Sequence, residues 1–340
     1  MREIRRVGAT SNLPAWRSNT GGKKRLSALA ASALILAAAA TGASASEIRI
    51  GITLADDIYL APILAAEKLG LFKKAGIEVK RSPIRGIEVG IEALRANQVD
   101  MIDAPGPAVA LASEKGLPGK IVVTSASGFF GWTVIVNKQS GYNALADLSG
   151  KKAGIATGRS LASMAAFLAM ERGQIKFDVD AVGAGSLMPM LRQNEIQAAI
   201  GPAMLGLREV AGDRARIVYD LSLGQQRYTV STLIATSEFI EKRPADLRAF
   251  LGAVAAALAH MQQNRKWSID LLKEHANLVN TALVERMHDN IIRRMTPGEA
   301  TDAKALKASM DLAARAWNLP EIANVDPGSL FTNDFLAPAQ

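Results

Sequence analysis

Residues 94–105 read LRANQVDMIDAP and residues 191–202 read LRQNEIQAAIGP, and the two stretches align without a gap at an offset of 97 residues. They share leucine, arginine, asparagine and proline at matching positions. Such a match arises by chance, from the common pattern of a helix leading into a strand, or from one structural plan used twice. Because the order of strand, loop and helix around both stretches also repeats, we expect two similar lobes.

Strands alternate with helices around the first of these stretches. Isoleucines alternate with other residues in 47–55, which is the period of a strand. A helix follows, with Pro62 in its first turn. Residues 77–80 and 99–103 read as further strands, and 87–96 carries apolar residues on one helical face. This alternation predicts an α/β fold with a mainly parallel sheet flanked by helices.

The same plan recurs about a hundred residues later. Residues 154–158 correspond to the first strand, a helix follows over 160–170, and 177–182 replaces the second strand. Two short apolar segments, 129–138 and 228–236, are predicted to be the strands that cross between the lobes.

These crossings divide the chain. We expect a discontinuous lobe I formed by residues 46–130 and 236–340, and a lobe II formed by residues 131–235. The pattern from Pro244 to about Trp317 is helical, and we place these helices on lobe I, where they close its sheet.

The N-terminus predicts export. Residues 23–25 are basic, 26–40 are an unbroken apolar run, and 43–45 read Ala-Ser-Ala, which together are typical of a secretory signal cleaved after Ala45. A membrane anchor is the alternative, but the apolar run falls short of the roughly 20 residues that span a bilayer. We therefore expect a periplasmic protein without stable membrane insertion.

Composition excludes several classes of function. Residues 1–45 carry six of the eight net positive charges, so the mature chain is near +2 and shows no electrostatic footprint for nucleic acid. The absence of cysteine excludes disulfides, thiolate metal sites, cysteine nucleophiles and a lipid-modified N-terminal cysteine. Aromatic residues make up only 5%, so the core must be aliphatic.

Four motifs carry a resemblance to a known family, and they read APILAAEKLGLFKKAGIEV (61–79), IEALRANQVDMIDA (91–104), ALADLSGKKAGIATGRS (144–160) and PADLRAFLGAVAAAL (244–258). With them, the chain resembles the periplasmic substrate-binding proteins for nitrate, taurine and aliphatic sulfonates, whose relatives bind pyrimidine precursors of thiamine. The resemblance covers nearly all of the mature chain. It implies a monomeric type II periplasmic binding protein with a ligand between its lobes. It also implies an ATP-binding-cassette permease and its ATPase as partners.

The ends of the predicted strands suggest where a ligand binds, because the crevice beyond the carboxyl ends of parallel strands is the usual place. We expect ligand contacts at Asp57, Tyr59, Arg85, Gly86, Pro105, Gly106, Phe130, Trp132, Thr157, Gly158, Ser160, Gly201, Pro202 and Tyr228.

Residues 157–160, Thr-Gly-Arg-Ser, join a strand to a helix start, where free N–H groups favour an anion. Ser160 either contacts the ligand or only caps the helix. Arg85 either pairs with an oxyanion through its fork of donors or lies in solvent. A carboxylate at Asp56 or Asp57 suits an amine or caps a helix. The aromatic residues of 129–132 either stack on the ligand or pack the hinge.

The ligand class therefore stays open between a small anion and a heterocycle such as a thiamine-precursor pyrimidine. An enzyme on the same fold is the remaining alternative. Its chemistry is hard to find, because His260, His275 and His288 lie in predicted helices without metal-ligand spacing. We expect neither catalysis nor a cofactor or metal.

Overall fold

The computed structural model describes residues 45–53, 58–276 and 280–337, which belong to the unit Ala45–Gln340. The predicted secretory signal lies outside the described residues, apart from Ala45. Within the described ranges, no helix has both the length and the apolar character needed to cross a bilayer.

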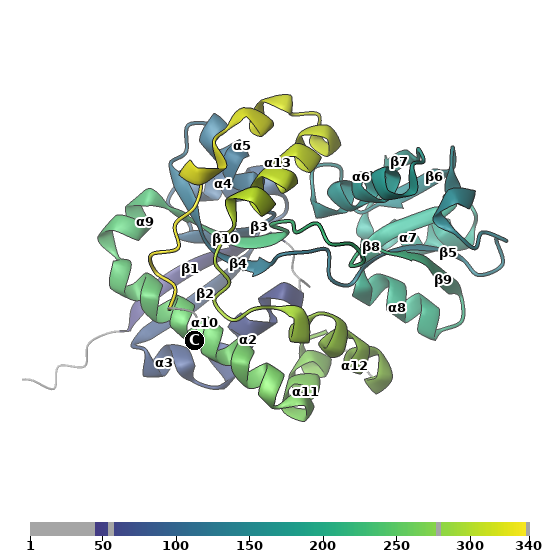
Figure 1. The fold of residues 1–340 in the computed structure, drawn as a ribbon. Helices are drawn as coiled ribbons and strands as arrows, with labels where there is room; N and C mark the ends of the chain where they lie inside the picture. Colours follow the sequence, from purple (N-terminus) through teal and green to yellow (C-terminus); the bar gives the residue numbers. More distant parts are fainter. Residues whose placement is uncertain (1–44, 54–57, 277–279, 338–340) are drawn as a thin grey trace, which may run out of the picture. The chain divides into compact units, whose positions relative to one another are not determined.

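Two five-stranded sheets organise the described chain (Figure 1). The spatial order is β2-β1-β3-β10-β4 in the first sheet and β7-β6-β8-β5-β9 in the second. The strands of the first sheet are β1 Ser46–Ile52, β2 Ile77–Pro83, β3 Met101–Ala104, β4 Gly119–Ala126 and β10 Ser231–Thr236. Those of the second are β5 Trp132–Asn137, β6 Lys152–Ile155, β7 Asp178–Ala181, β8 Ala198–Pro202 and β9 Ala215–Asp220.

One strand in each sheet runs against its neighbours. β10 pairs antiparallel with β3 and β4, and β5 pairs antiparallel with β8 and β9, whereas β1 with β2 and β3, and β6 with β7 and β8, pair in parallel. The antiparallel strand is the first one after the chain has crossed from the other sheet. Two similar lobes with mainly parallel sheets are therefore confirmed, and the residue boundaries of the lobes stay a prediction.

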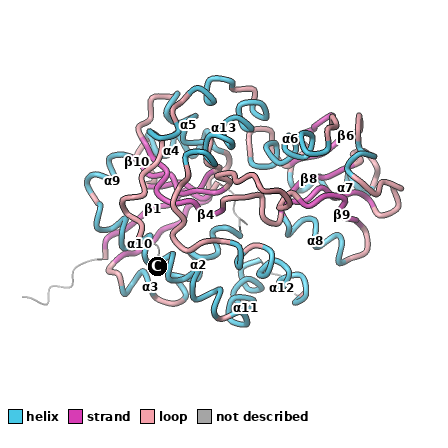
Figure 2. Tube along the Cα trace, viewed as in Figure 1, coloured by secondary structure: helices cyan, strands magenta, loops and turns pink. Residues whose placement is uncertain are grey.

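Helices flank both sheets (Figure 2). They are α2 Ala61–Lys68, α3 Leu71–Lys74, α4 Ile87–Arg95, α5 Ala108–Glu114, α6 Leu161–Gly173, α7 Ala184–Arg192, α8 Ala203–Ala211, α9 Ser237–Lys242, α10 Pro244–Gln263, α11 Arg265–Ala276, α12 Thr281–Asn290 and α13 Ala303–Trp317. Short 3-10 turns lie at Ile58–Leu60, Leu145–Leu148, Ile292–Arg294, Pro320–Asn324 and Pro327–Ser329.

Alternation along β5 explains how the second sheet is covered. Val134 and Val136 belong to the large core cluster that includes the buried residues of α6. Ile135, between them, packs with Leu187 and Leu191 of α7. Because successive side chains of a strand point to opposite faces, one apolar strand binds helices on both sides.

Helix α6 is covered from two directions, which fits its sequence LASMAAFLAMERG, apolar almost all round. It packs on β6 and β8 of its own sheet and also on α13. Trp317 at the end of α13 donates from Nε1 to the Ser160 carbonyl oxygen at 3.1 Å, and Arg315 pairs with Glu171 at 2.5 Å. The C-terminal helices that we expected to cover lobe I therefore also contact lobe II.

The repeat at an offset of 97 has a backbone cause. Gly86 and Gly183 precede α4 and α7 with φ of 101° and 85°, and Asn97 and Asn194 follow these helices with φ of 54° and 59°. Glycine and asparagine are the residues that enter positive φ at least cost. The shared asparagine in the two aligned stretches thus marks the same left-handed turn between helix and strand.

We predict that Asn194→Ala lowers the free energy of unfolding by about 1 kcal/mol, because the left-handed backbone conformation is higher in free energy for alanine than for asparagine. The matched control, Asn194→Gly, should stay within about 0.5 kcal/mol of the natural protein. Urea unfolding followed by circular dichroism measures both. Equal losses in the two variants would show that the asparagine side chain, and not the backbone conformation, matters here.

Candidate functional site

Two connectors decide where a ligand can bind. Connector 1 (residues 127–131) joins β4 to β5, and connector 2 (residues 221–230) joins β9 to β10. Since β4 and β9 run in the same direction as the parallel strands of their sheets, the carboxyl ends of those strands lie toward the connectors in both lobes. Open parallel sheets usually bind ligands at this edge. The predicted site residues that follow the strands of lobe I and those that follow the strands of lobe II both lie along it.

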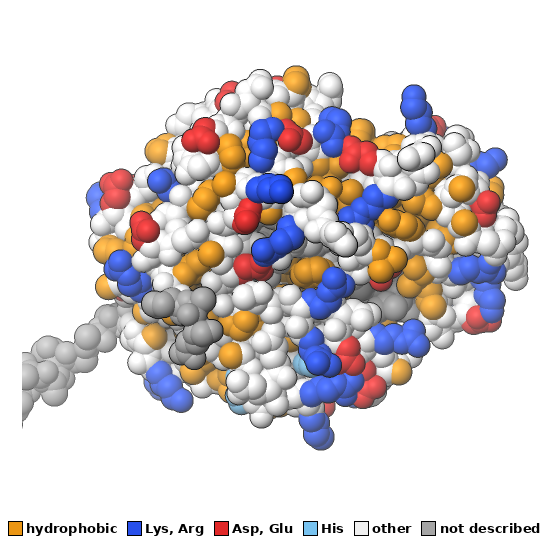
Figure 3. Space-filling view, in the orientation of Figure 1, with side chains coloured by type: hydrophobic (Ala, Val, Ile, Leu, Met, Phe, Trp, Pro, Cys, Tyr) orange, Lys and Arg blue, Asp and Glu red, His pale blue; other side chains and the backbone are white. Residues whose placement is uncertain are grey.

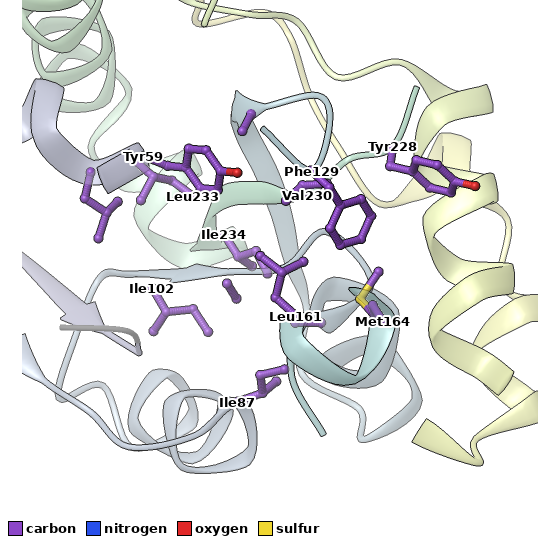
Figure 4. Close-up of a cluster of buried hydrophobic side chains, with 14 of the residues drawn as sticks. Tyr59, Ile87, Ile102, Phe129, Leu161, Met164, Tyr228, Val230, Leu233 and Ile234 are labelled. Carbon is purple, nitrogen blue, oxygen red and sulfur yellow. The ribbon is translucent and has the colours of Figure 1, made fainter. Parts of the chain in front are cut away.

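Aromatic rings pack the connectors against each other. Phe129 lies edge-to-face with Trp132, with ring centroids 6.4 Å apart, and with Tyr228 at 5.7 Å. All three side chains are buried, and burial raises the pKa of the Tyr228 hydroxyl. Figure 4 shows Phe129 and Tyr228 in the same buried cluster as Met164 of α6. The hinge-packing interpretation therefore accounts for these rings, and ligand contact by Trp132 and Tyr228 stays a prediction.

Close contacts also fasten the connectors to lobe I. The hydroxyl of Tyr59, in the 3-10 turn that precedes α2, donates to the Phe130 carbonyl oxygen at 2.5 Å. The backbone N–H of Gly106 donates to the Thr229 carbonyl oxygen at 3.2 Å. A Cβ at position 106 would lie only 2.7 Å from that oxygen, so glycine is required where the turn after β3, with half-buried Pro105, meets connector 2.

The matching turn of lobe II begins at the end of β8. Gly201 and Pro202 lie opposite Thr133 and Trp132 of β5. Gly201 is buried, and Pro202, in extended conformation, precedes the first turn of α8. These two predicted residues therefore lie at the end of β8, beside the start of β5, the strand that follows connector 1.

The exposed members of the predicted site come from two loops, which we call the loop pair (residues 85–88 and 157–160). Arg85, Gly86, Thr157 and Gly158 are all exposed. Arg85 makes no ion pair or hydrogen bond with any residue that the structure describes. A Cβ at Gly158 would meet nothing within 4 Å among described atoms, so space is open beside that backbone.

An ion pair joins the two halves of the loop pair. Arg159 Nη1 lies 3.1 Å from Glu88 Oε1, and the side chains are 51% and 35% exposed. Glu88 lies in the first turn of α4, where the helix dipole favours a carboxylate. Sequence reasoning did not predict this pairing, because Glu88 lies 71 residues away and reads as an ordinary first-turn residue.

Ser160 caps α6. Its Oγ accepts a hydrogen bond from the Ala162 N–H at 3.1 Å and donates to the Thr157 carbonyl oxygen at 2.8 Å. The capping role weighed from the sequence is therefore present, and direct contact with a ligand stays a prediction. Asp57, together with Asp56, lies outside the described residues.

Several acidic and histidine side chains outside the loop pair have partners within the fold. Asp100 pairs with Arg49 at 2.7 Å, Asp103 accepts from the Thr53 N–H at 2.5 Å, and Asp147 accepts two backbone N–H bonds in lobe II. His288 is buried beside Asp289. Across the described ranges, no group of three or more His, Cys, Asp and Glu side chains is placed to hold a metal ion.

Sequence reasoning missed the buried carboxylate of Glu299, which contacts connector 2. Residues 295–300 (Met-Thr-Pro-Gly-Glu-Ala) read as a plain loop. Glu299 is 6% exposed and pairs with Arg227 of connector 2. Burial raises the pKa of its carboxyl, although a hydrogen bond from Ser127 and the charge of Arg227 act in the opposite direction. Its Oε2 atom is buried without a hydrogen-bond partner among described atoms.

This raised pKa predicts a pH dependence. Folding favours the protonated carboxyl, so the stability due to Glu299 is present below the ordinary pKa of 4.5 and is lost as pH rises through the raised value. Glu299→Gln mimics the protonated form and should melt increasingly higher, relative to the natural protein, as pH rises above the ordinary pKa of 4.5. The control Glu321→Gln, at an exposed position, should show no such trend. A difference in melting temperature that does not change with pH would contradict the shift.

Comparisons with known proteins agree with this geometry. A family model described as NMT1/THI5 like matches residues 57–266. A Brucella abortus protein named as a candidate binding protein is 25% identical over 214 residues, 61% of this chain and 65% of that protein. A Bacillus subtilis protein named as a candidate aliphatic sulfonates-binding protein is 32% identical over 148 residues, 41% of this chain and 43% of that protein. These matches span less than two thirds of the relatives' own length.

Solved structures share the fold. The alkanesulfonate-binding protein SsuA from Xanthomonas axonopodis pv. citri, bound to MOPS, has a TM-score of 0.69 and 17% identity, over 85% of this chain and 98% of that chain. The predicted type II periplasmic binding fold, with two similar lobes, is thereby confirmed.

Proposed function

This chain belongs to the NMT1/THI5-like family, and on that premise we propose that it is the periplasmic solute-binding component of an ATP-binding-cassette importer. It captures a small anionic solute of the sulfonate, taurine or nitrate kind between its lobes. It then delivers the solute to a membrane permease driven by an ATPase. In this proposal the chain is exported by a signal cleaved after Ala45, acts as a monomer and catalyses no reaction.

The observation that carries the proposal is the loop pair. An arginine without an ion-pair partner among described residues, Arg85, lies in the lobe I half, and the N-terminal turn of α6 with Arg159 lies in the lobe II half. A guanidinium offers a fixed fork of donors, and a helix start offers free N–H groups, so both suit an oxyanion. The structurally similar Xanthomonas protein binds alkanesulfonates, which are oxyanions of this kind.

Closing of the two lobes around a solute follows from the position of the loop pair, which has one half in each lobe. A solute that contacts both halves of the loop pair binds the closed arrangement more tightly than an open one, and this difference in affinity shifts the population toward the closed form. Glu88 competes for Arg159, so an oxyanion either displaces that carboxylate or is held by Arg85. The site thus accepts one anionic group and penalises a second.

A thermal-shift screen with taurine, ethanesulfonate, nitrate and an aminopyrimidine tests the proposal. A specific ligand at a hundredfold excess over its Kd stabilises the fold by about 2.7 kcal/mol and raises the melting temperature. Recovery of the ligand unchanged after incubation separates binding from turnover. A protein with native circular dichroism that responds to none of the four classes would contradict it.

Replacing the exposed arginine sharpens the test. Arg85→Ala should weaken binding of the responding anion about tenfold or more, because a charge-assisted hydrogen bond contributes about 1.5–3 kcal/mol. Arg286→Ala, which removes an equally exposed charge from α12, is the control and should bind as the natural protein does. Isothermal titration measures both, and equal affinities would place Arg85 outside the site.

A further inference from the structure

One segment of lobe I contacts both connectors. Residues 291–301, between α12 and α13, are named the brace here. The brace is fastened to lobe I, because Gln262 of α10 donates from Nε2 to the Met295 carbonyl oxygen at 2.7 Å. The Thr124 N–H of β4 also donates to the Glu299 carbonyl oxygen at 3.0 Å. Basic side chains gather over the middle of the face drawn in Figure 3, where Figure 1 draws the connectors.

Arg294 is the first brace residue that reaches both connectors. Its guanidinium carbon lies 4.2 Å from the ring centroid of Phe130 in connector 1, within the range of a cation–π contact. Its Nη2 atom lies 3.5 Å from the carbonyl oxygen of Ser222 in connector 2. The Arg294 side chain therefore contacts a ring of connector 1 and a backbone oxygen of connector 2.

Glu299 is the second brace residue that lies beside both connectors. Its carboxylate pairs with Arg227 of connector 2, and the neighbouring Ser127 of connector 1 acts to lower the pKa of that carboxyl. Because the carboxylate is buried, a movement that separated it from Arg227 would leave a charge without its partner, which is costly. Arg294 contacts both connectors, and Glu299, five residues farther along the same short segment, pairs with connector 2 and lies beside connector 1.

We propose that the brace couples the two connectors so that they move together, and that it stabilises the interlobe arrangement of this structure. Closing of a two-lobed protein requires both connectors to change conformation. A common contact makes those changes dependent on each other, because neither connector can turn without disturbing Arg294 and Glu299. The proposal rests on the two-lobed motion of the proposed function, and not on the identity of the solute.

Fluorescence energy transfer between the lobes tests the brace in the protein without added solute. The chain has no cysteine, so Gln98→Cys in lobe I and Glu195→Cys in lobe II accept dyes without background, and both positions are exposed. Arg294→Ala should lower the ratio of molecules in the arrangement seen here to all others by about threefold or more. Arg293→Ala, at an exposed neighbour that makes no hydrogen bond or ion pair with a connector among the described residues, should leave the distribution unchanged.

A second variant measures the coupling. If both residues hold the same pair of connectors, the effect of Arg294→Ala combined with Glu299→Gln should be smaller than the product of the two single effects. Arg294→Met, which keeps side-chain length, should behave as Arg294→Ala does. A distribution in Arg294→Ala identical to that of Arg293→Ala, in proteins with equal melting temperatures, would overturn the proposal. A clear shift in Arg294→Ala, with no response in the solute screen, would retain the brace and reject the proposed function.

Discussion

Each sheet contains one strand that arrives from the other lobe and runs against its neighbours, and this constraint sets where the carboxyl ends of the parallel strands lie. β5 and β10 can enter only after the chain has left the carboxyl end of β4 or β9. The carboxyl ends of the parallel strands in both lobes must then lie toward the same two connectors. The strand order alone therefore places the edge at which open parallel sheets usually bind ligands next to the connectors in both lobes.

The residues at this edge divide into two groups with different physical roles. Near the connectors, rings and backbone lie in close contact: Phe129 packs against two other aromatics, Tyr59 holds a carbonyl oxygen, and Gly106 allows a backbone approach that no Cβ would permit. Farther from them, the loop pair is exposed and charged. Buried, closely packed groups favour a defined conformation of the connectors, while the exposed Arg85 has no ion-pair partner among the described residues and can reach a solute.

Lobe II also contacts connector 2, so this connector is bound by hydrogen bonds from both lobes. Arg172, near the end of α6, donates to the Leu221 carbonyl oxygen of connector 2 at 2.8 Å. Because α6 also packs on α13, the C-terminal helices, α6 and the connectors form one continuous buried network. Relative movement of the lobes is thus limited by packing as well as by chain connection.

Sequence patterns predicted those parts of the architecture that depend on residues close together in the chain, such as turns and helix caps. The aligned stretches that contain Asn97 and Asn194 indicated two lobes, and the structure shows that both asparagines adopt positive φ after equivalent helices. Capping was one of the two roles weighed for Ser160, because capping is a local interaction. The pairing of Arg159 with Glu88 and the burial of Glu299 were not predictable, since they depend on segments distant in sequence. Clustered aromatics such as Phe129 and Trp132 have the same sequence signature in a ligand pocket and in a packed hinge.

Small-angle scattering on the mature protein tests most directly the central claim that two lobes trap a solute between facing strand ends. Saturation with a solute that raises the melting temperature should reduce the radius of gyration, because the lobes approach each other around it. A radius of gyration that stays the same at full occupancy would contradict the account.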